Sequence, residues 1–147
     1  MPRTTTVVAL AASSLFTTAA TAQVTFEFQD SGQALGNNFS RSVAVALGDL
    51  DGDGDLDAMV GNINQPNTVW TNDGSGTFTN SGQALGNSQS RSVALGDLDG
   101  DGDLDAMVGN YNQPNTVWTN DGTGTFTNSG QALGNSSSLS VALGDLD

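Results

Sequence analysis

The chain contains a long direct repeat. Residues 48–62 recur at 96–110, an offset of 48 residues, and the same offset relates 67–74 to 115–122. Units that recur in tandem at such a spacing bury their apolar side chains against their neighbours, so the hydrophobic core belongs to the array. The repeat therefore predicts a row of similar supersecondary units.

Each repeat has the pattern of four short strands. Segments rich in Val, Leu and Ala at 92–95 and 104–108 flank an acidic loop, and β-forming residues follow at 116–119 and 125–127, each after a turn. Nineteen glycines among 147 residues argue against long helices. Four strands in ~40 to 50 residues are typical of a β-propeller blade. We therefore expect an all-β chain of four-stranded antiparallel blades.

The repeat alignment sets the expected boundaries of the domain. The repeat region at 23–147 consists, in order, of a partial blade at 24–40, whole repeats at 41–90 and 91–138, and a truncated repeat at 139–147. In this alignment, Ser42–Leu47 is two residues longer than Ser92–Leu95, and Arg41 corresponds to Arg91.

The number of repeats is too small for a closed ring. A propeller takes about 4 to 8 blades, whereas this chain holds two whole repeats and ends at Asp147 inside a third acidic loop. We expect truncation at that point and an incomplete ring in this chain. Open blade faces and unpaired strand edges then predict weak stability or self-association.

Residues 1–22 have the pattern of a secretory signal peptide. Arg3 precedes an apolar run at 7–12, and Ala20-Thr21-Ala22 forms a small-residue cleavage site. The apolar run is far shorter than the ~20 residues that span a bilayer. We therefore expect a secreted chain, extracellular or at the cell surface, with no membrane span and a mature part that begins at Gln23.

The composition excludes much of catalytic chemistry. The chain has no His and no Cys, and its 16 acidic residues against 3 basic ones give a net charge of −13 at pH 7. Ser-His-Asp triads, cysteine nucleophiles and zinc sites all need an imidazole or a thiolate. An acidic surface repels the phosphates of nucleic acids. We expect no enzyme activity and no nucleic-acid partner.

Most of the acidic residues lie in two nine-residue loops with the pattern D-x-D-x-D-G-D-x-D. The candidate metal ligands are Asp49, Asp51, Asp53, Asp55 and Asp57 in the first loop, and Asp97, Asp99, Asp101, Asp103 and Asp105 in the second. Clustered carboxylates and carbonyls suit Ca²⁺, which takes six to eight oxygen ligands in flexible geometry. An EF-hand would need Glu at loop position 12, where this chain has Val60 and Val108. The loops thus predict calcium sites between strands.

The run from Val93 to Gly109, with a strand on each side of the acidic loop and a blade-length period, resembles the FG-GAP/VCBS repeats. These occur in the propeller of integrin α-subunits and in many secreted bacterial proteins. The resemblance implies a Ca²⁺ ion held by the side chains at loop positions 1, 3, 5 and 9 and by the carbonyl at position 7. These are Asp49, Asp51, Asp53 and Asp57 with the Asp55 carbonyl, and Asp97, Asp99, Asp101 and Asp105 with the Asp103 carbonyl.

The resemblance implies a secreted calcium-binding module that binds an extracellular protein or glycan, for example in adhesion. Two alternatives stay open: a non-catalytic part of a larger secreted hydrolase or lyase, and a carbohydrate-binding lectin. Trp70 and Trp118 occupy the same position in the two repeats. Aromatic side chains that recur at the same repeat position are expected to fill the core between blades, although they can also form a platform for sugars.

Overall fold

The computed structural model describes residues 27, 29–36 and 41–145. The predicted signal peptide at 1–22 lies outside the described residues. The chain divides into two units, Met1–Asp30 and Ser31–Asp147, and all the strands belong to the second. Within the expected partial blade at 24–40, the described residues form no strand.

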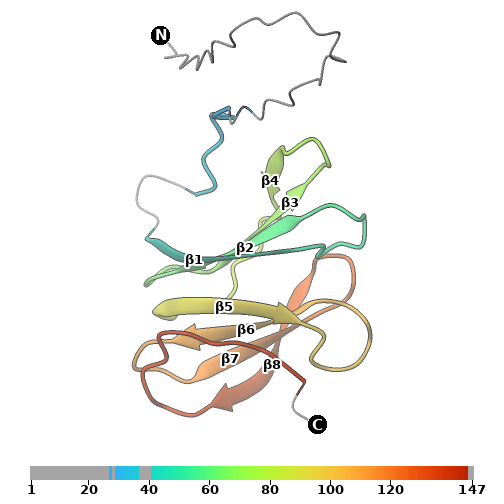
Figure 1. Cartoon of the computed structure of the whole chain (residues 1–147). Coiled ribbons are helices and arrows are strands. Elements are labelled where there is room, and N and C mark those ends of the chain that lie inside the picture. Colours follow the sequence, from blue (N-terminus) through green and yellow to red (C-terminus); the bar gives the residue numbers. More distant parts are fainter. Residues whose placement is uncertain (1–26, 28, 37–40, 146–147) are drawn as a thin grey trace, which may run out of the picture. The chain divides into compact units, whose positions relative to one another are not determined.

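The first repeat folds into a four-stranded antiparallel sheet (Figure 1). Its strands are β1 (Ser42–Gly48), β2 (Asp57–Asn62), β3 (Thr68–Asn72) and β4 (Phe78–Asn80). Each strand pairs with the next along the chain, in the order β1-β2-β3-β4. This meander is the arrangement expected of a propeller blade.

The second repeat forms a sheet with the same antiparallel order, β5-β6-β7-β8. Its strands are β5 (Ser90–Gly96), β6 (Asp105–Asn110), β7 (Asn115–Asn120) and β8 (Phe126–Leu133). Residues 27, 29–36 and 41–145 contain no helix. The predicted all-β class and the two four-stranded antiparallel units are confirmed.

Strand pairing corrects the alignment of the first strands. Leu47 pairs with Ala58 as Leu95 pairs with Ala106, and both first strands carry an irregularity at the same place, after Ser42 and after Ser90. Strands β1 and β5 therefore match over seven residues each. The prediction that 42–47 contains two additional residues is wrong, because the register places them between Gly36 and Ser42.

The same register corrects the pairing of the two arginines. The carbonyl of Arg41 accepts a hydrogen bond from the Ile63 amide, and the carbonyl of Gln89 accepts the equivalent bond from Tyr111. Arg41 thus corresponds to Gln89, and Val43 corresponds to Arg91. The guanidinium of Arg91 lies 5.2 Å from the centre of the Tyr111 ring, at a distance that permits cation–π attraction.

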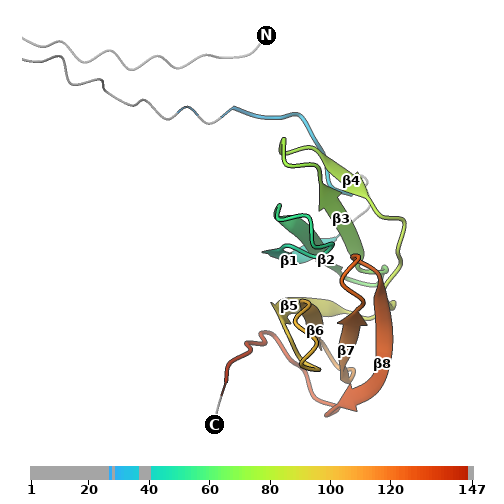
Figure 2. The ribbon, with the colours of Figure 1, turned by 90° about the vertical axis from the view of Figure 1, so that its right-hand side faces the viewer.

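The hydrophobic core lies between the two sheets, which stack face to face with β5 against β1 and β2 (Figure 2). Its buried members are Leu50, Met59, Val69, Leu85, Ala106, Val108, Trp118 and Phe126. Neither sheet has this core by itself, as expected for tandem repeats. Trp118 is buried as predicted, whereas the equivalent Trp70 is only half-buried.

Candidate metal centre

The two acidic loops connect the first and second strands of each sheet. The first runs from the end of β1 at Gly48 to the start of β2 at Asp57, and the second from Gly96 to Asp105. Tight turning in the first loop requires positive φ angles at Gly52 (79°) and Gly54 (92°), a region that glycine enters without steric cost. The glycines thus allow the loop to turn tightly enough for several of its carboxylates to converge.

The first aspartate of each loop closes the turn. The Asp49 carboxylate accepts hydrogen bonds from the amides of Gly52 at 2.8 Å and Gly54 at 3.0 Å. Asp97 accepts the equivalent bonds at 2.7 and 3.1 Å. These bonds fix the position of one carboxylate within each loop.

The last aspartate of each loop anchors the loop to the sheet. Asp57 is fully buried, and its two oxygens accept hydrogen bonds from the amides of Leu50 and Asn72, both at 2.8 Å. Asp105 repeats this arrangement, with the Leu98 amide at 2.8 Å and the Asn120 amide at 2.9 Å. A buried carboxylate is tolerated here because both of its oxygens are hydrogen-bonded.

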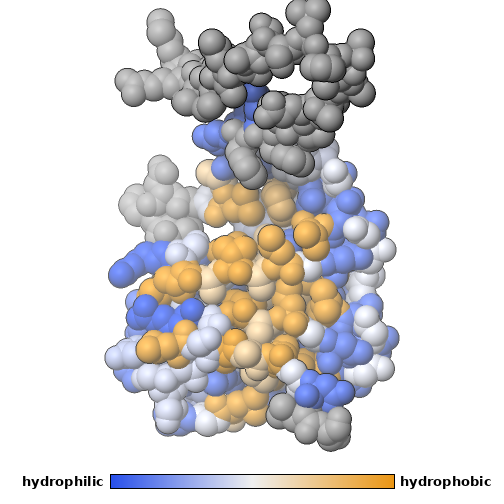
Figure 3. Space-filling model, in the orientation of Figure 1, coloured by the Kyte–Doolittle hydropathy of each residue, from blue (hydrophilic) through white to orange (hydrophobic). Residues whose placement is uncertain are grey.

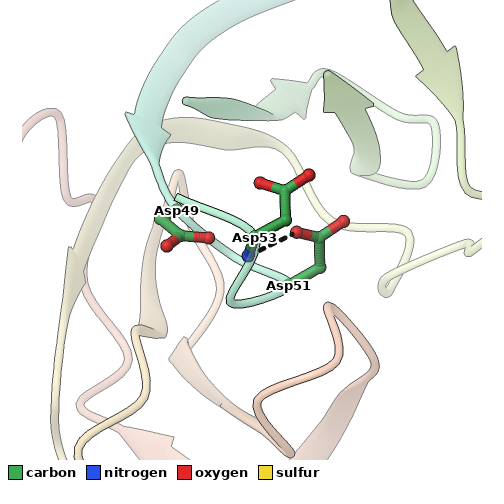
Figure 4. Close-up of side chains that lie close together, drawn as sticks. All are labelled: Asp49, Asp51 and Asp53. Atoms are coloured by element: carbon green, nitrogen blue, oxygen red, sulfur yellow. Dashed lines mark hydrogen bonds between the residues drawn. The ribbon is translucent and has the colours of Figure 1, made fainter. Parts of the chain in front are cut away.

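Three carboxylates converge in each loop. One oxygen each from Asp49, Asp51 and Asp53 lies within 4.8 Å of the others in the first loop (Figure 4). In the second loop the converging group consists of Asp97, Asp99 and Asp105. The two groups share positions 1 and 3 and differ in the third member, position 5 in one and position 9 in the other.

The other predicted ligands lie outside these groups. Asp57 in the first loop and Asp101 in the second are not members, although their repeat partners are. The side chains of Asp55 and Asp103 lie against Gly74 and Gly122, where an added Cβ would meet their carboxylates. These two side chains are directed at the next turn of the sheet, and only their carbonyls, as the resemblance implies, are left for a loop-bound ion.

Burial and then charge repulsion raise the pKa of one carboxyl at position 3 of each loop. Burial, followed by the charges of Asp57 and Asp53, raises the pKa of the Asp51 carboxyl. In the second loop, burial and then the charge of Asp101 raise the pKa of Asp99. Since the charged form is disfavoured in both positions, a cation at this place would relieve the repulsion.

The pKa values of two aspartates in the neighbouring turns are lowered instead of raised. A hydrogen bond from the Thr123 hydroxyl, at 2.6 Å, lowers the pKa of Asp121. The Ser75 hydroxyl does the same for Asp73. The lowered pKa values of Asp73 and Asp121 distinguish these carboxyls from Asp51 and Asp99 in the loops, whose pKa values are raised.

Sequence reasoning missed that the first loop also belongs to the contact between the sheets. Leu50, at loop position 2, is 1% exposed, and its carbonyl accepts a hydrogen bond from the Asn120 side chain at 2.9 Å. Leu98 at the same position of the second loop is 38% exposed. The repetition of Leu at this position was a signal of a buried role, but only contact with the second sheet makes Leu50 buried.

The family comparison agrees with this geometry. Two overlapping stretches, residues 49–108 and 97–147, match the FG-GAP-like repeat. The chain belongs to the FG-GAP-like repeat family. Each match begins at the first aspartate of an acidic loop, so the residues that converge in the structure are part of the FG-GAP-like unit. A comparison with curated proteins finds no significant match.

FG-GAP-like repeats are typically non-catalytic and form propeller-type binding modules, and the two blade-like sheets agree with that architecture. The donor set of each loop consists of oxygens alone, which fits a hard divalent cation such as Ca²⁺. None of the described residues belongs to a helix long and apolar enough to cross a membrane.

Proposed function

We propose that this chain is a secreted, calcium-stabilised binding module whose FG-GAP-like blades present a surface to an extracellular protein or glycan. The observation that carries the proposal is the convergence of three carboxylate oxygens in the same loop of both repeats. Secretion rests on the signal-peptide pattern at 1–22, and the binding role rests on membership of the family.

Calcium would be held by side-chain oxygens that the fold brings together. Positions 1 and 3 of each loop supply Asp49 and Asp51, or Asp97 and Asp99. Positions 5 and 9 complete the set, with the carbonyl at position 7. When bound, the ion supplies positive charge that offsets carboxylate repulsion and links both strands of the hairpin.

Calorimetric titration of the mature chain with Ca²⁺ tests the metal sites. We expect two sites per chain, with dissociation constants of ~10⁻⁴ to 10⁻³ M as in other extracellular modules. Asp99→Asn should leave one site, whereas Asp121→Asn, in a turn outside the loops, should leave two. Absence of binding heat at millimolar Ca²⁺ would contradict the calcium proposal.

Export is tested by expressing the full 147-residue chain in a secreting host and sequencing the N-terminus of the released protein. Cleavage after Ala22 predicts a mature chain that begins with Gln23. A chain that stays in the cytoplasm and keeps the residues before Gln23 would contradict the secreted assignment. It would leave the calcium proposal intact.

A further inference from the structure

The first sheet leaves one apolar face exposed. Val43, Val45, Leu47 and Leu56 are 43%, 61%, 57% and 57% exposed, and together we call them the open face. Apolar residues also form a band over the displayed side of the molecule (Figure 3). Exposed side chains of this size, gathered on one sheet, are typical of an interaction surface.

The second sheet shows what this surface is built to contact. Val93, Leu95 and Leu104 occupy the repeat positions of Val45, Leu47 and Leu56, and they pack against the core. A Cβ added at Gly61 would lie 3.1 Å from the Val93 side chain, and one added at Gly48 would lie 3.2 Å from Leu95. The open face therefore carries the side chains that, one repeat later, pack closely on the back of a preceding blade.

A cavity beside the open face supports an apolar occupant. It has a volume of about 540 Å³, and Leu35, Pro66 and Trp70 are among its lining residues. Two of its side-chain donors are already engaged: Trp70 Nε1 donates to the Thr68 hydroxyl at 3.0 Å, and the Asn62 amide donates to the Pro66 carbonyl at 2.8 Å. A polar ligand such as a sugar would find these donors engaged.

The equivalent place in the second sheet is filled by the chain itself. Trp118 is 8% exposed there, and Leu85, from the segment that leads out of the first sheet, is 3% exposed. The carbon Cζ2 of Trp118 lies 3.3 Å from the position of a Cβ on Gly86. Around Trp70, Leu35 lies at the repeat position of Leu85 and lines the cavity, so the rest of this packing would need a further blade.

The outer face of the second sheet carries the matching surface, covered by the segment 138–145. The Ser138 amide donates to the Asn110 carbonyl at 2.9 Å, and the Val141 amide donates to the Ser92 hydroxyl at 3.1 Å. Val141 and Leu143 lie close to Gly109 and Gly96, as Val93 and Leu95 lie close to Gly61 and Gly48. This segment thus covers the second sheet in the way that β5 covers the first.

We propose that the open face binds a second copy of this chain, head to tail, by replacing segment 138–145 on that copy's second sheet. Residues 42–49 (SVAVALGD) and 138–145 (SLSVALGD) differ at two positions only, so they fit the same surface. The incoming sheet brings Leu56 and three further strands, whereas segment 138–145 forms no strand of its own. The incoming sheet would also bury Leu98, which is 38% exposed. The equivalent Leu50, which the second sheet covers, is only 1% exposed.

A glutamine bridge adds polar specificity to this contact. Gln83 joins the two sheets: its side-chain nitrogen donates to the Gly124 carbonyl at 2.6 Å, and its oxygen accepts from the Phe126 amide at 2.8 Å. Gln33 makes the same pair of bonds to Gly76 and Phe78, both at 2.7 Å. Gln131 is exposed at the third equivalent position. In the head-to-tail contact, the Gln131 side chain would replace Gln33 of the incoming copy in the bonds to Gly76 and Phe78.

Such a contact joins different surfaces of the two copies, so it leads to rings or open chains and not only to dimers. Sedimentation velocity of the full chain, over a range of concentrations from micromolar upward, measures it. We expect association that grows with concentration. A chain that stays monomeric throughout overturns the proposal.

Two double variants at equivalent repeat positions test the surface itself. Val45→Asp with Leu47→Asp should weaken association about tenfold or more, because charges are placed in the contact. Val141→Asp with Leu143→Asp should strengthen it, because these changes weaken the hold of segment 138–145 on the second sheet. Equal weakening by both pairs would overturn the proposal, since unspecific apolar adhesion predicts that result.

Folding and metal binding are checked separately from association. The substituted side chains are exposed or half-buried, and far-UV circular dichroism should show unchanged β structure in both variants. Sedimentation is measured in Ca²⁺ and in EDTA. If the two double variants differ from each other in the same way in both solutions, the association is independent of calcium binding, and this proposal is tested separately from the calcium proposal. Loss of calcium binding alone leaves the contrast between the two variants in place.

Discussion

Asp57 and Asp105 have a structural role that their position in an acidic motif does not reveal. Each is fully buried and accepts two backbone hydrogen bonds, one from its own loop and one from the third strand of its sheet. These carboxylates therefore connect each loop to its own sheet. The remaining aspartates of each loop are more exposed and repel one another, so their arrangement depends more on what binds there.

Replacing the buried carboxylate of Asp105 by an amide tests this anchoring role. Asp105→Asn turns one accepting oxygen into a donor that faces a backbone amide, and we expect the free energy of unfolding in EDTA to fall by about 1 to 3 kcal/mol. Asp101→Asn is the matched control, because it keeps the oxygen that accepts from the Asp103 amide. Urea unfolding of both variants measures the difference; similar values would contradict the anchoring role.

Titration of the loop carboxylates predicts how calcium stabilisation varies with pH. The pKa values of Asp51 and Asp99 are raised, so these groups take up protons at a higher pH than ordinary aspartates and then release a bound cation. In EDTA, the same raised pKa values mean that stability increases as the pH falls through them. As the pH falls, the two effects together should therefore reduce the difference between the melting temperatures in Ca²⁺ and in EDTA.

Melting curves between pH 7 and pH 4 measure this gap. Asp121 provides an internal contrast: its lowered pKa contributes stability above the ordinary aspartate pKa and loses it only as the pH falls through the lowered value. Thr123→Val should weaken that contribution in Ca²⁺ and EDTA alike. A gap that stays constant down to pH 4 would contradict protonation of the loop ligands.

At the scale of the elements, identical loops have different surroundings. The first loop lies against the second sheet, with Gly52 near the Gly122 carbonyl and the Asn120 side chain bonded to the Leu50 carbonyl. The second loop has no such neighbour among residues 41–145, and Leu98 is exposed accordingly. The conformation of the first loop and the packing of the two sheets are therefore coupled.

Truncation of the same leucine in the two loops measures this difference. Leu50→Ala removes a buried side chain from the core and should cost about 2 to 5 kcal/mol, whereas Leu98→Ala should cost less than about 1 kcal/mol. Both variants are compared by urea unfolding at low protein concentration, where the chain is monomeric. Equal losses would mean that the two sheets do not pack through Leu50.

At the scale of the whole molecule, two sheets share a single core and no disulfide strengthens them, because the chain has no cysteine. A small array of this kind has a narrow margin of stability. Ligands that bind only the folded state then have a large effect. The acidic loops are candidate sites for such a ligand, and Ca²⁺ is the ion that we propose for them.

Calcium should therefore raise the melting temperature substantially. An ion at ten times its dissociation constant adds about 1.4 kcal/mol per site, so two sites add ~3 kcal/mol. Melting in Ca²⁺ and in EDTA should differ by several degrees, and Asp51→Asn combined with Asp99→Asn should remove most of the difference. Coincident curves for the unchanged chain would show that the loops are not structural metal sites.

The sequence alone determined the features that depend on local pattern. The period of 48 residues, the four strands per unit and the aspartate spacing are all visible in the repeat, because strand alternation, turn glycines and ligand spacing are encoded within one unit. Membership of the FG-GAP-like family follows from the same residues. The acidic segments do lie between the first and second strands of each unit, as predicted, although the convergence of particular carboxylates within them was not evident.

Only the tertiary structure decided what distinguishes one repeat from the next. Leu50 and Leu98 have the same neighbours in sequence, as do Trp70 and Trp118, yet one of each pair is buried and the other is not. Burial depends on whether another sheet covers the residue, and no local pattern carries that information. The register of β1 was likewise determined by hydrogen bonds across the sheet, because the pairing of strands, and not the similarity of their amino-acid sequences, sets which residues are equivalent.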